Sequence, residues 1–96
     1  MAREIIVLGD TSTHGGTVIT ASPDVYANGR RVARVGDLLD CGNSHHGTNK
    51  IKTGSDDVYA NGKKVARYDD ETECGAKLRP KDKRTVFVNS LNEKDA

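Results

Sequence analysis

A duplicated six-residue segment constrains this chain more than any other feature. Residues 24–29 have the sequence Asp-Val-Tyr-Ala-Asn-Gly, and residues 57–62 repeat it letter for letter, 33 positions later. The likeness continues through the eight residues that follow each copy, and a weaker third copy occupies residues 86–90. A repeat of this length indicates that one supersecondary unit is used several times and that neighbouring copies share a core.

Each copy is predicted to form a β-hairpin. Its Asn-Gly pair supplies the two positive-φ residues of a type I′ turn, and a basic and apolar alternation follows the turn. A two-residue turn places Tyr26 opposite Arg31 and Val25 opposite Val32, so we expect Val25 and Val32 to face inward together. Three such hairpins predict an all-β, pseudo-threefold fold, and we expect it to form a single domain over residues 1–91 with a polar tail at 92–96.

A short turn precedes each hairpin-like segment. The pairs Gly9-Asp10, Gly36-Asp37 and Asp69-Asp70 occupy equivalent places in the three copies. Glycine allows unusual φ angles, and an aspartate side chain can bond the backbone two residues further along the chain. Because a catalytic carboxylate would not need to recur in every copy, we interpret these aspartates as structural.

The composition leaves little material for a core. Only 19 of the 96 residues are Leu, Ile, Val or Phe, and ten are glycine. A domain with so few core residues usually requires a metal, a disulfide or a partner for stability. The longest apolar run near the start, residues 5–8, is far shorter than a signal-peptide core or a membrane span. We therefore expect synthesis in the cytoplasm, where two cysteines favour thiols or metal ligands over a disulfide.

The three copies carry metal-competent side chains at one equivalent position. Four residues beyond the turn aspartate, the chain has His14, Cys41 and Cys74. The middle copy contains about six extra residues, which include His45 and His46 and can supply a fourth ligand. Zinc prefers a tetrahedral shell of thiolates and imidazoles, and four protein ligands are typical of a structural site. The sequence therefore predicts a structural zinc ion that staples the apex of the fold and contributes folding energy.

Spacing alone leaves the ligand set open. His46 is preferred to His45 because Gly47 allows the backbone to turn sharply after the ligand, and His45 remains the substitute. The competing interpretations are a Cys41–Cys74 disulfide, histidines that are ordinary surface residues, a catalytic zinc with an open position, and a Cys-His nucleophilic pair. No candidate histidine has a neighbouring glutamate, so a structural site is favoured over a catalytic one.

Charge argues against nucleic acid as a partner. The chain has 15 basic and 14 acidic residues, a formal net charge of +1, and only 4% aromatic residues. A nucleic-acid-binding domain of this size usually shows a basic excess. The interspersed charges instead indicate a well-solvated surface.

The repeats and the ligand-bearing loops together resemble the PAAR-repeat proteins. The resemblance rests on Gly9–Asp10 with His14, on the repeated Val-Ala-Arg segments at 32–34 and 65–67, and on Cys41, His46-Gly47 and Cys74-Gly75, and it covers about residues 5–90. The proline of the name-giving motif is absent from both copies, which have Arg31-Val32 and Lys64-Val65 in its place.

Membership of that family implies a pointed, conical β-fold with zinc near its vertex. The metal site of the family is often three histidines and one cysteine, which here would draw on His14, His45, His46 and one cysteine. Such a domain caps a trimeric β-helical spike, either a VgrG-like protein of a type VI secretion system or the central spike of a contractile phage tail. The implied role is mechanical rather than enzymatic: the cap sharpens the spike and helps it breach an envelope, contacting the target membrane transiently.

These expectations place the protein on a phage tail tip or outside the cell after type VI secretion. The alternatives are a zinc-dependent hydrolase or toxin, and a cargo-adaptor module that carries effectors. The sequence does not discriminate between a phage tail and a secretion apparatus.

Overall fold

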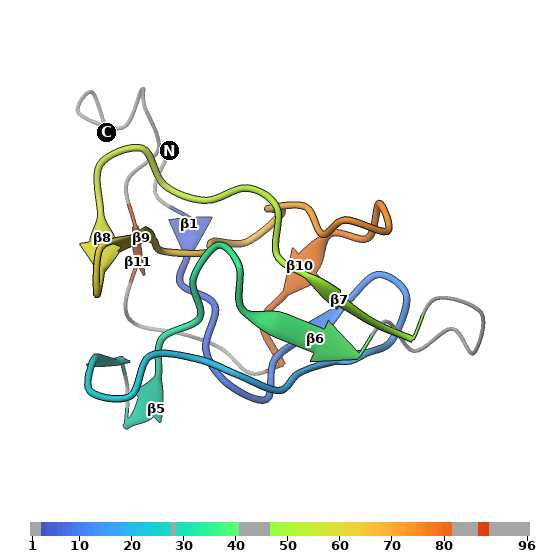
Figure 1. Ribbon diagram of the computed structural model, residues 1–96, viewed down its shortest axis with the longest axis horizontal. Coiled ribbons are helices and arrows are strands. Elements are labelled where there is room, and N and C mark those ends of the chain that lie inside the picture. The colour runs from blue at the N-terminus through green and yellow to red at the C-terminus, as the bar shows by residue number, and fades with distance from the viewer. Residues whose placement is uncertain (1–2, 28, 41–46, 82–86, 89–96) are drawn as a thin grey trace.

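The computed structural model describes residues 3–27, 29–40, 47–81 and 87–88. For Phe87 and Val88 it describes the backbone alone. The molecule is elongated, with principal extents of 41 × 25 × 25 Å (Figure 1). Its described residues form short antiparallel strands and no helix, which confirms the all-β prediction. The strands are β1 (Arg3–Glu4), β2 (Thr11–Ser12), β3 (Thr17–Val18), β4 (Tyr26–Ala27), β5 (Arg30–Arg31), β6 (Leu38–Asp40), β7 (Thr48–Lys50), β8 (Tyr59–Ala60), β9 (Lys63–Lys64), β10 (Leu78–Arg79) and β11 (Phe87–Val88).

The two sequence copies form hairpins in the predicted register. Tyr26 pairs with Arg31 in β4–β5, and Tyr59 pairs with Lys64 at the equivalent place in β8–β9. The second turn has Asn61 at φ 56° and Gly62 at φ 78°, the two positive values that a type I′ turn requires. Asn28, the equivalent of Asn61, lies outside the described residues.

The third hairpin joins the two ends of the chain. Strand β11 pairs with β1, and Arg3 lies opposite Val88 and Glu4 opposite Phe87. The predicted third copy at residues 86–90 thus accounts for one strand of this hairpin, β11. The second strand, β1, comes from the N-terminus of the chain. It follows that residues 5–7 are equivalent to residues 32–34 and 65–67.

A ring of backbone hydrogen bonds marks the pseudo-threefold axis. The N–H of Ile6 donates to Ala66, the N–H of Ala66 to Ala33, and the N–H of Ala33 to Ile6, at 2.9–3.0 Å. Three isolated bridges surround this ring in the same cyclic order, at Val7–Val32, Arg34–Val65 and Ile5–Arg67. Because each copy bonds the next and the last bonds the first, none can form its pairing alone.

Beyond the ring, the chain closes a small barrel. Five strands pair in the order β10-β2-β3-β6-β7, and bridges at Ile51–Thr72 and Glu71–Lys77 connect β7 back to β10. The two described turns of this barrel, residues 13–16 and 73–76, point away from the hairpins and toward the right in Figure 1. We call the end formed by residues 13–16 and 73–76, with Asp40 and Gly47, the loop end. We call the opposite end, which contains the strand pairs β4–β5, β8–β9 and β1–β11, the hairpin end.

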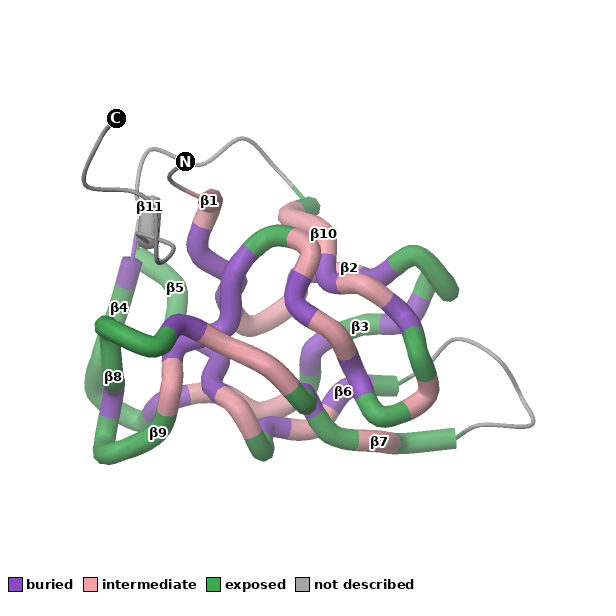
Figure 2. The backbone as a smooth tube through the Cα atoms, turned by 90° about the horizontal axis from the view of Figure 1, so that it is seen from above, coloured by how far each residue is buried: buried purple, intermediate pink, exposed green. Residues whose placement is uncertain are grey.

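Apolar side chains fill two layers along the axis, and Figure 2 shows the buried stretches running through the middle of the molecule. The layer in the hairpin end contains Ile5, Val7, Ala27, Val32, Ala60 and Val65, and the barrel layer contains Ile6, Val18, Ala33, Leu39, Ile51, Ala66 and Leu78. The expectation that Val25 faces inward with Val32 was wrong. Val32 is 1% exposed, whereas Val25, which precedes β4, is 36% exposed, and Ala27 packs in the hairpin-end layer instead.

The repeated aspartates have the structural role that the sequence predicted, but they bond the backbone three residues earlier rather than two residues later. Asp10, Asp37 and Asp70 are buried, and each accepts the N–H of the residue three positions earlier at 2.7–2.9 Å. Each carboxylate also accepts a hydrogen bond from the preceding copy around the ring: Asp37 from Thr20 Oγ1, Asp70 from Thr53 Oγ1, and Asp10 from the backbone N–H of Lys81. The aspartates therefore fasten neighbouring copies to one another.

Candidate functional site

Two of the five predicted metal ligands meet at the loop end. The Nδ1 atom of His14 lies 3.6 Å from the Sγ atom of Cys74. His14 is exposed and Cys74 is half-buried. Their turns are neighbours because β10 pairs with β2, so residues that are far apart in the chain become adjacent. The other three candidates, Cys41, His45 and His46, lie outside the described residues.

The two turns present these side chains through the same backbone geometry. Gly15 follows His14 with φ 86°, and Gly75 follows Cys74 with φ 87°. These are left-handed conformations, which glycine adopts without a steric cost. The turns are also joined, because the N–H of Thr13 donates to the carbonyl of Lys77 at 2.9 Å.

The thiol of Cys74 has a polar surrounding. The Oγ1 atom of Thr72 lies 3.2 Å from the sulfur and accepts the N–H of Ala76 at 3.1 Å. The N–H of Cys74 donates to Oδ1 of Asn49 at 3.3 Å. Within the part of the chain that the structure describes, the buried Nδ2 of Asn49 has no hydrogen-bond partner. The Thr72 hydroxyl therefore contacts the sulfur, and the Asn49 side chain holds the backbone of Cys74.

The geometry of this pair fits zinc. Bond lengths of about 2.3 Å to sulfur and about 2.0–2.1 Å to nitrogen, at a tetrahedral angle, separate two ligands by about 3.6 Å. Imidazole and thiolate are the donors that zinc prefers. The described residues contain no group of three or more metal-binding side chains, since the other candidates belong to 41–46. The chain enters and leaves that loop at Asp40 and Gly47, and Asp40 pairs with Thr17 beside the His14 turn.

The hairpin end exposes an apolar pair in each of its two described repeats. Val25 and Tyr26 are 36% and 55% exposed, and Val58 and Tyr59 are 38% and 54% exposed. The close agreement between the copies shows that these side chains are displayed by the fold rather than by chance. The hairpin pattern alone did not reveal this, because alternation predicts two faces without saying which is covered.

A buried ion pair stiffens the region between the two ends. Arg34 donates hydrogen bonds from Nε and Nη2 to the carboxylate of Asp37 at 2.9 and 3.0 Å, and Arg67 donates to Asp70 in the same arrangement. Burial raises the pKa of Asp37, but hydrogen bonds from Arg34 and Thr20 outweigh it and hold that pKa below its ordinary value. The hydrogen bond to Asp37 in turn raises the pKa of Arg34 against the opposing effect of burial.

Sequence reasoning missed the residues around the candidate ligands and the copy at the N-terminus. Thr72, Asn49 and Ser12 contact the backbone or side chains of His14 and Cys74. The likeness of residues 7–10 to 34–37, both ending in Gly-Asp, was a signal that could have identified the missing strand.

Comparison with known proteins gives one family. A family model described as PAAR motif matches residues 8–80 of the 96. No functionally curated protein gives a significant match. Within the described residues, no helix has the length and apolar character needed to cross a membrane.

Proposed function

The chain belongs to the PAAR motif family, whose members have a structural role at spike tips in secretion and phage systems, and from that premise we propose that it caps the end of a trimeric β-helical spike. The spike is a VgrG-like protein or a phage central spike. The observation that carries this proposal is the cyclic arrangement of three hairpins at one end of the molecule. A single chain with this pseudo-threefold end matches a threefold partner.

The exposed side chains of the hairpin end support the proposal that this end of the molecule faces the spike. A trimer that ends in open strand edges needs apolar and hydrogen-bonding cover. Val25 and Tyr26 offer apolar surface in one sector, and Val58 and Tyr59 repeat it in the next. We infer that the hairpin end docks on the spike and that the loop end points toward the target envelope, which it helps to penetrate.

A zinc ion at the loop end completes the proposal. His14, Cys41, His46 and Cys74 would hold it, with His45 as the alternative imidazole. The 3.6 Å separation of His14 and Cys74 supports this set. The positive φ of Gly47 at 59° supports His46, since Gly15 and Gly75, which follow His14 and Cys74, have φ of the same sign. A bound zinc would supply a structural cross-link rather than a reaction, and the chain would act mechanically rather than as an enzyme.

The experiment that tests the cap is reconstitution with the trimeric spike protein encoded in the same genome. We expect a complex of one cap and three spike chains by light scattering. The double variant Tyr26→Asp/Tyr59→Asp should weaken binding at least tenfold, because it places two charges in an apolar contact. Ile19→Asp is the matched control, since Ile19 is 48% exposed but lies outside the hairpin end. Absence of a complex with the wild-type chain, or equal weakening by Ile19→Asp, would contradict the proposal.

A further inference from the structure

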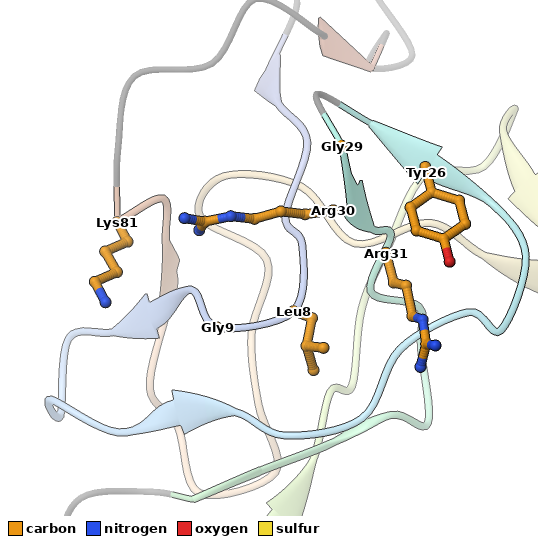
Figure 3. Close-up of a pocket in the computed structure, with 7 residues that line it drawn as sticks. All are labelled: Leu8, Gly9, Tyr26, Gly29, Arg30, Arg31 and Lys81. Atoms are coloured by element: carbon orange, nitrogen blue, oxygen red, sulfur yellow. The ribbon is translucent and has the colours of Figure 1, made fainter.

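A pocket of about 550 Å³ lies beside the first hairpin. Its lining residues are Leu8, Gly9, Tyr26, Gly29, Arg30, Arg31 and Lys81. Figure 3 shows Arg30 and Lys81 extending on one side of Leu8, with Arg31 and Tyr26 on the other. Among the lining residues that the structure describes, three of seven are cationic and none is a carboxylate, although the chain as a whole is almost neutral.

The second sector of the fold neutralises the equivalent charge. Lys64 is the counterpart of Arg31, and its Nζ lies 3.1 Å from Oδ1 of Asp56. The counterpart of Asp56 in the first sector is Pro23, which has no charge to offer. The next aspartate, Asp24, accepts a hydrogen bond from Asn61 Nδ2 at 2.9 Å instead.

The third sector keeps a basic residue, Arg3, at the position of Arg30 but has an acidic residue at the position of Arg31. Glu4 occupies the position of Arg31, as the register of β1 with β11 shows. Asp69 occupies the position of Gly9 and forms an ion pair with Arg79. The basic pocket therefore belongs to the first sector, and it breaks the threefold pattern that the rest of the hairpin end keeps.

This asymmetry indicates the kind of partner. A threefold spike meets all three sectors alike, so it gives no reason for one sector to differ. We propose that the pocket binds an acidic segment of a single partner polypeptide, one copy per molecule. Arg31 and Lys81 attract its carboxylates, while Leu8 and Tyr26 contact its apolar atoms. Gly9 and Gly29 have no side chain and allow its backbone to approach closely.

An acidic peptide fits better than a nucleic acid. A pocket of about 550 Å³ can hold only a few residues of a peptide, and the formal net charge of +1 is small for a protein that follows a phosphate backbone. The pocket shares Tyr26 with the proposed docking surface but takes its charges from Arg31 and Lys81, so peptide binding can be measured without the spike. Failure of the spike complex would leave it standing.

The test is a titration of the ¹⁵N-labelled protein with a hexaglutamate peptide, followed by NMR. We expect saturable one-to-one shifts of the Gly9 and Gly29 amides, weakened by added salt. Arg31→Glu or Lys81→Glu should raise the dissociation constant at least fivefold. Lys64→Glu is the matched control at the equivalent strand position, and it should leave the constant unchanged.

Three outcomes would overturn the proposal. The first is a lack of saturable shifts at Gly9 and Gly29. The second is equal shifts at Gly62, the counterpart of Gly29, which would mean non-selective attraction to any basic hairpin. The third is tighter binding of a single-stranded oligodeoxynucleotide, or of pyrophosphate, at the same amides. The amide spectra of the charge-reversed variants also show directly whether each has folded.

Discussion

The Nδ1 atom of His14 lies 3.6 Å from the Sγ atom of Cys74, although 60 residues separate the two in the chain. Strand pairing produces this proximity, because β10 lies beside β2 and brings the two turns together. Each turn is also held by a glycine of positive φ directly after the candidate ligand, Gly15 in one and Gly75 in the other. Strand pairing and the two glycine turns thus bring the two side chains together.

This geometry predicts a zinc-dependent stability. We expect the purified protein to contain one equivalent of zinc, and we expect a strong chelator to lower its melting temperature. Cys74→Ser should lower zinc affinity by at least tenfold, because serine is a poor ligand for zinc. Elemental analysis and competition with a chromogenic chelator measure both effects. Glu73→Gln is the control, as it alters a neighbouring exposed residue that carries none of the proposed ligands. A metal-free and equally stable wild-type protein, or a Cys41–Cys74 disulfide detected by mass, would refute the prediction.

The hydroxyl of Thr72 should support the same site. It lies 3.2 Å from the sulfur of Cys74, and a hydrogen bond to a bound thiolate is the kind of outer contact that tunes metal affinity. Thr72→Val should weaken zinc binding about tenfold and shift the thiolate-to-metal absorption of the cobalt-substituted protein. Thr72→Ser keeps the hydroxyl and should restore both values. If the serine variant behaves like valine, Thr72 acts through packing alone.

The buried pair of Arg34 and Asp37 predicts a stability that depends on pH in acid. The pKa of Asp37 is held below its ordinary value of 3.8 in the folded protein. The unfolded chain therefore binds the proton more readily, so this contribution is complete above pH 3.8 and is lost as pH falls through the folded pKa. Chemical denaturation between pH 2 and pH 6 should show stability rising with pH.

The variant Asp37→Asn separates this contribution from others. It leaves Arg34 buried without its charged partner, and it should cost about 3–5 kcal/mol at neutral pH. Its stability should also change less with pH in the acid range. Asp56→Asn removes the exposed pair with Lys64 and should have little effect. A neutral-pH loss no larger for Asp37→Asn than for Asp56→Asn would contradict the assignment.

Packing at the pseudo-threefold axis gives a fourth prediction. Ile6 is fully buried in the barrel layer, where its two equivalents are Ala33 and Ala66. Ile6→Ala should cost about 2–5 kcal/mol of unfolding free energy, because the ring of small residues cannot collapse into the space. Ile19→Ala removes the same atoms from a side chain that is 48% exposed and should cost far less. Urea denaturation of both variants compares them directly, and equal losses would show that the axis is not the core.

Some of this structure followed from local patterns. The Asn-Gly turns and the register of Tyr26 with Arg31 could be predicted, because a two-residue hairpin fixes both from adjacent residues. The structural role of Asp37 could be predicted too, since a carboxylate that bonds the N–H three residues earlier needs only the local turn. The exposure of Val25 could not be predicted, because it depends on which other segments of the fold cover that side of the hairpin.

The sequence by itself determined the repeated unit, the aspartate-braced turns and the family, because each depends on residues that are close in the chain. Tertiary structure decided how the copies close. The N-terminal strand completes the third hairpin with β11, and three backbone hydrogen bonds join the copies in a ring. It also decided that one sector carries a basic pocket. Lys64 has Asp56 as a partner, whereas the first sector has Pro23 at the position of Asp56, and only the folded hairpin shows that these positions lie beside the basic side chain. Contacts between distant segments have no local pattern, and the folded backbone is what brings their partners together.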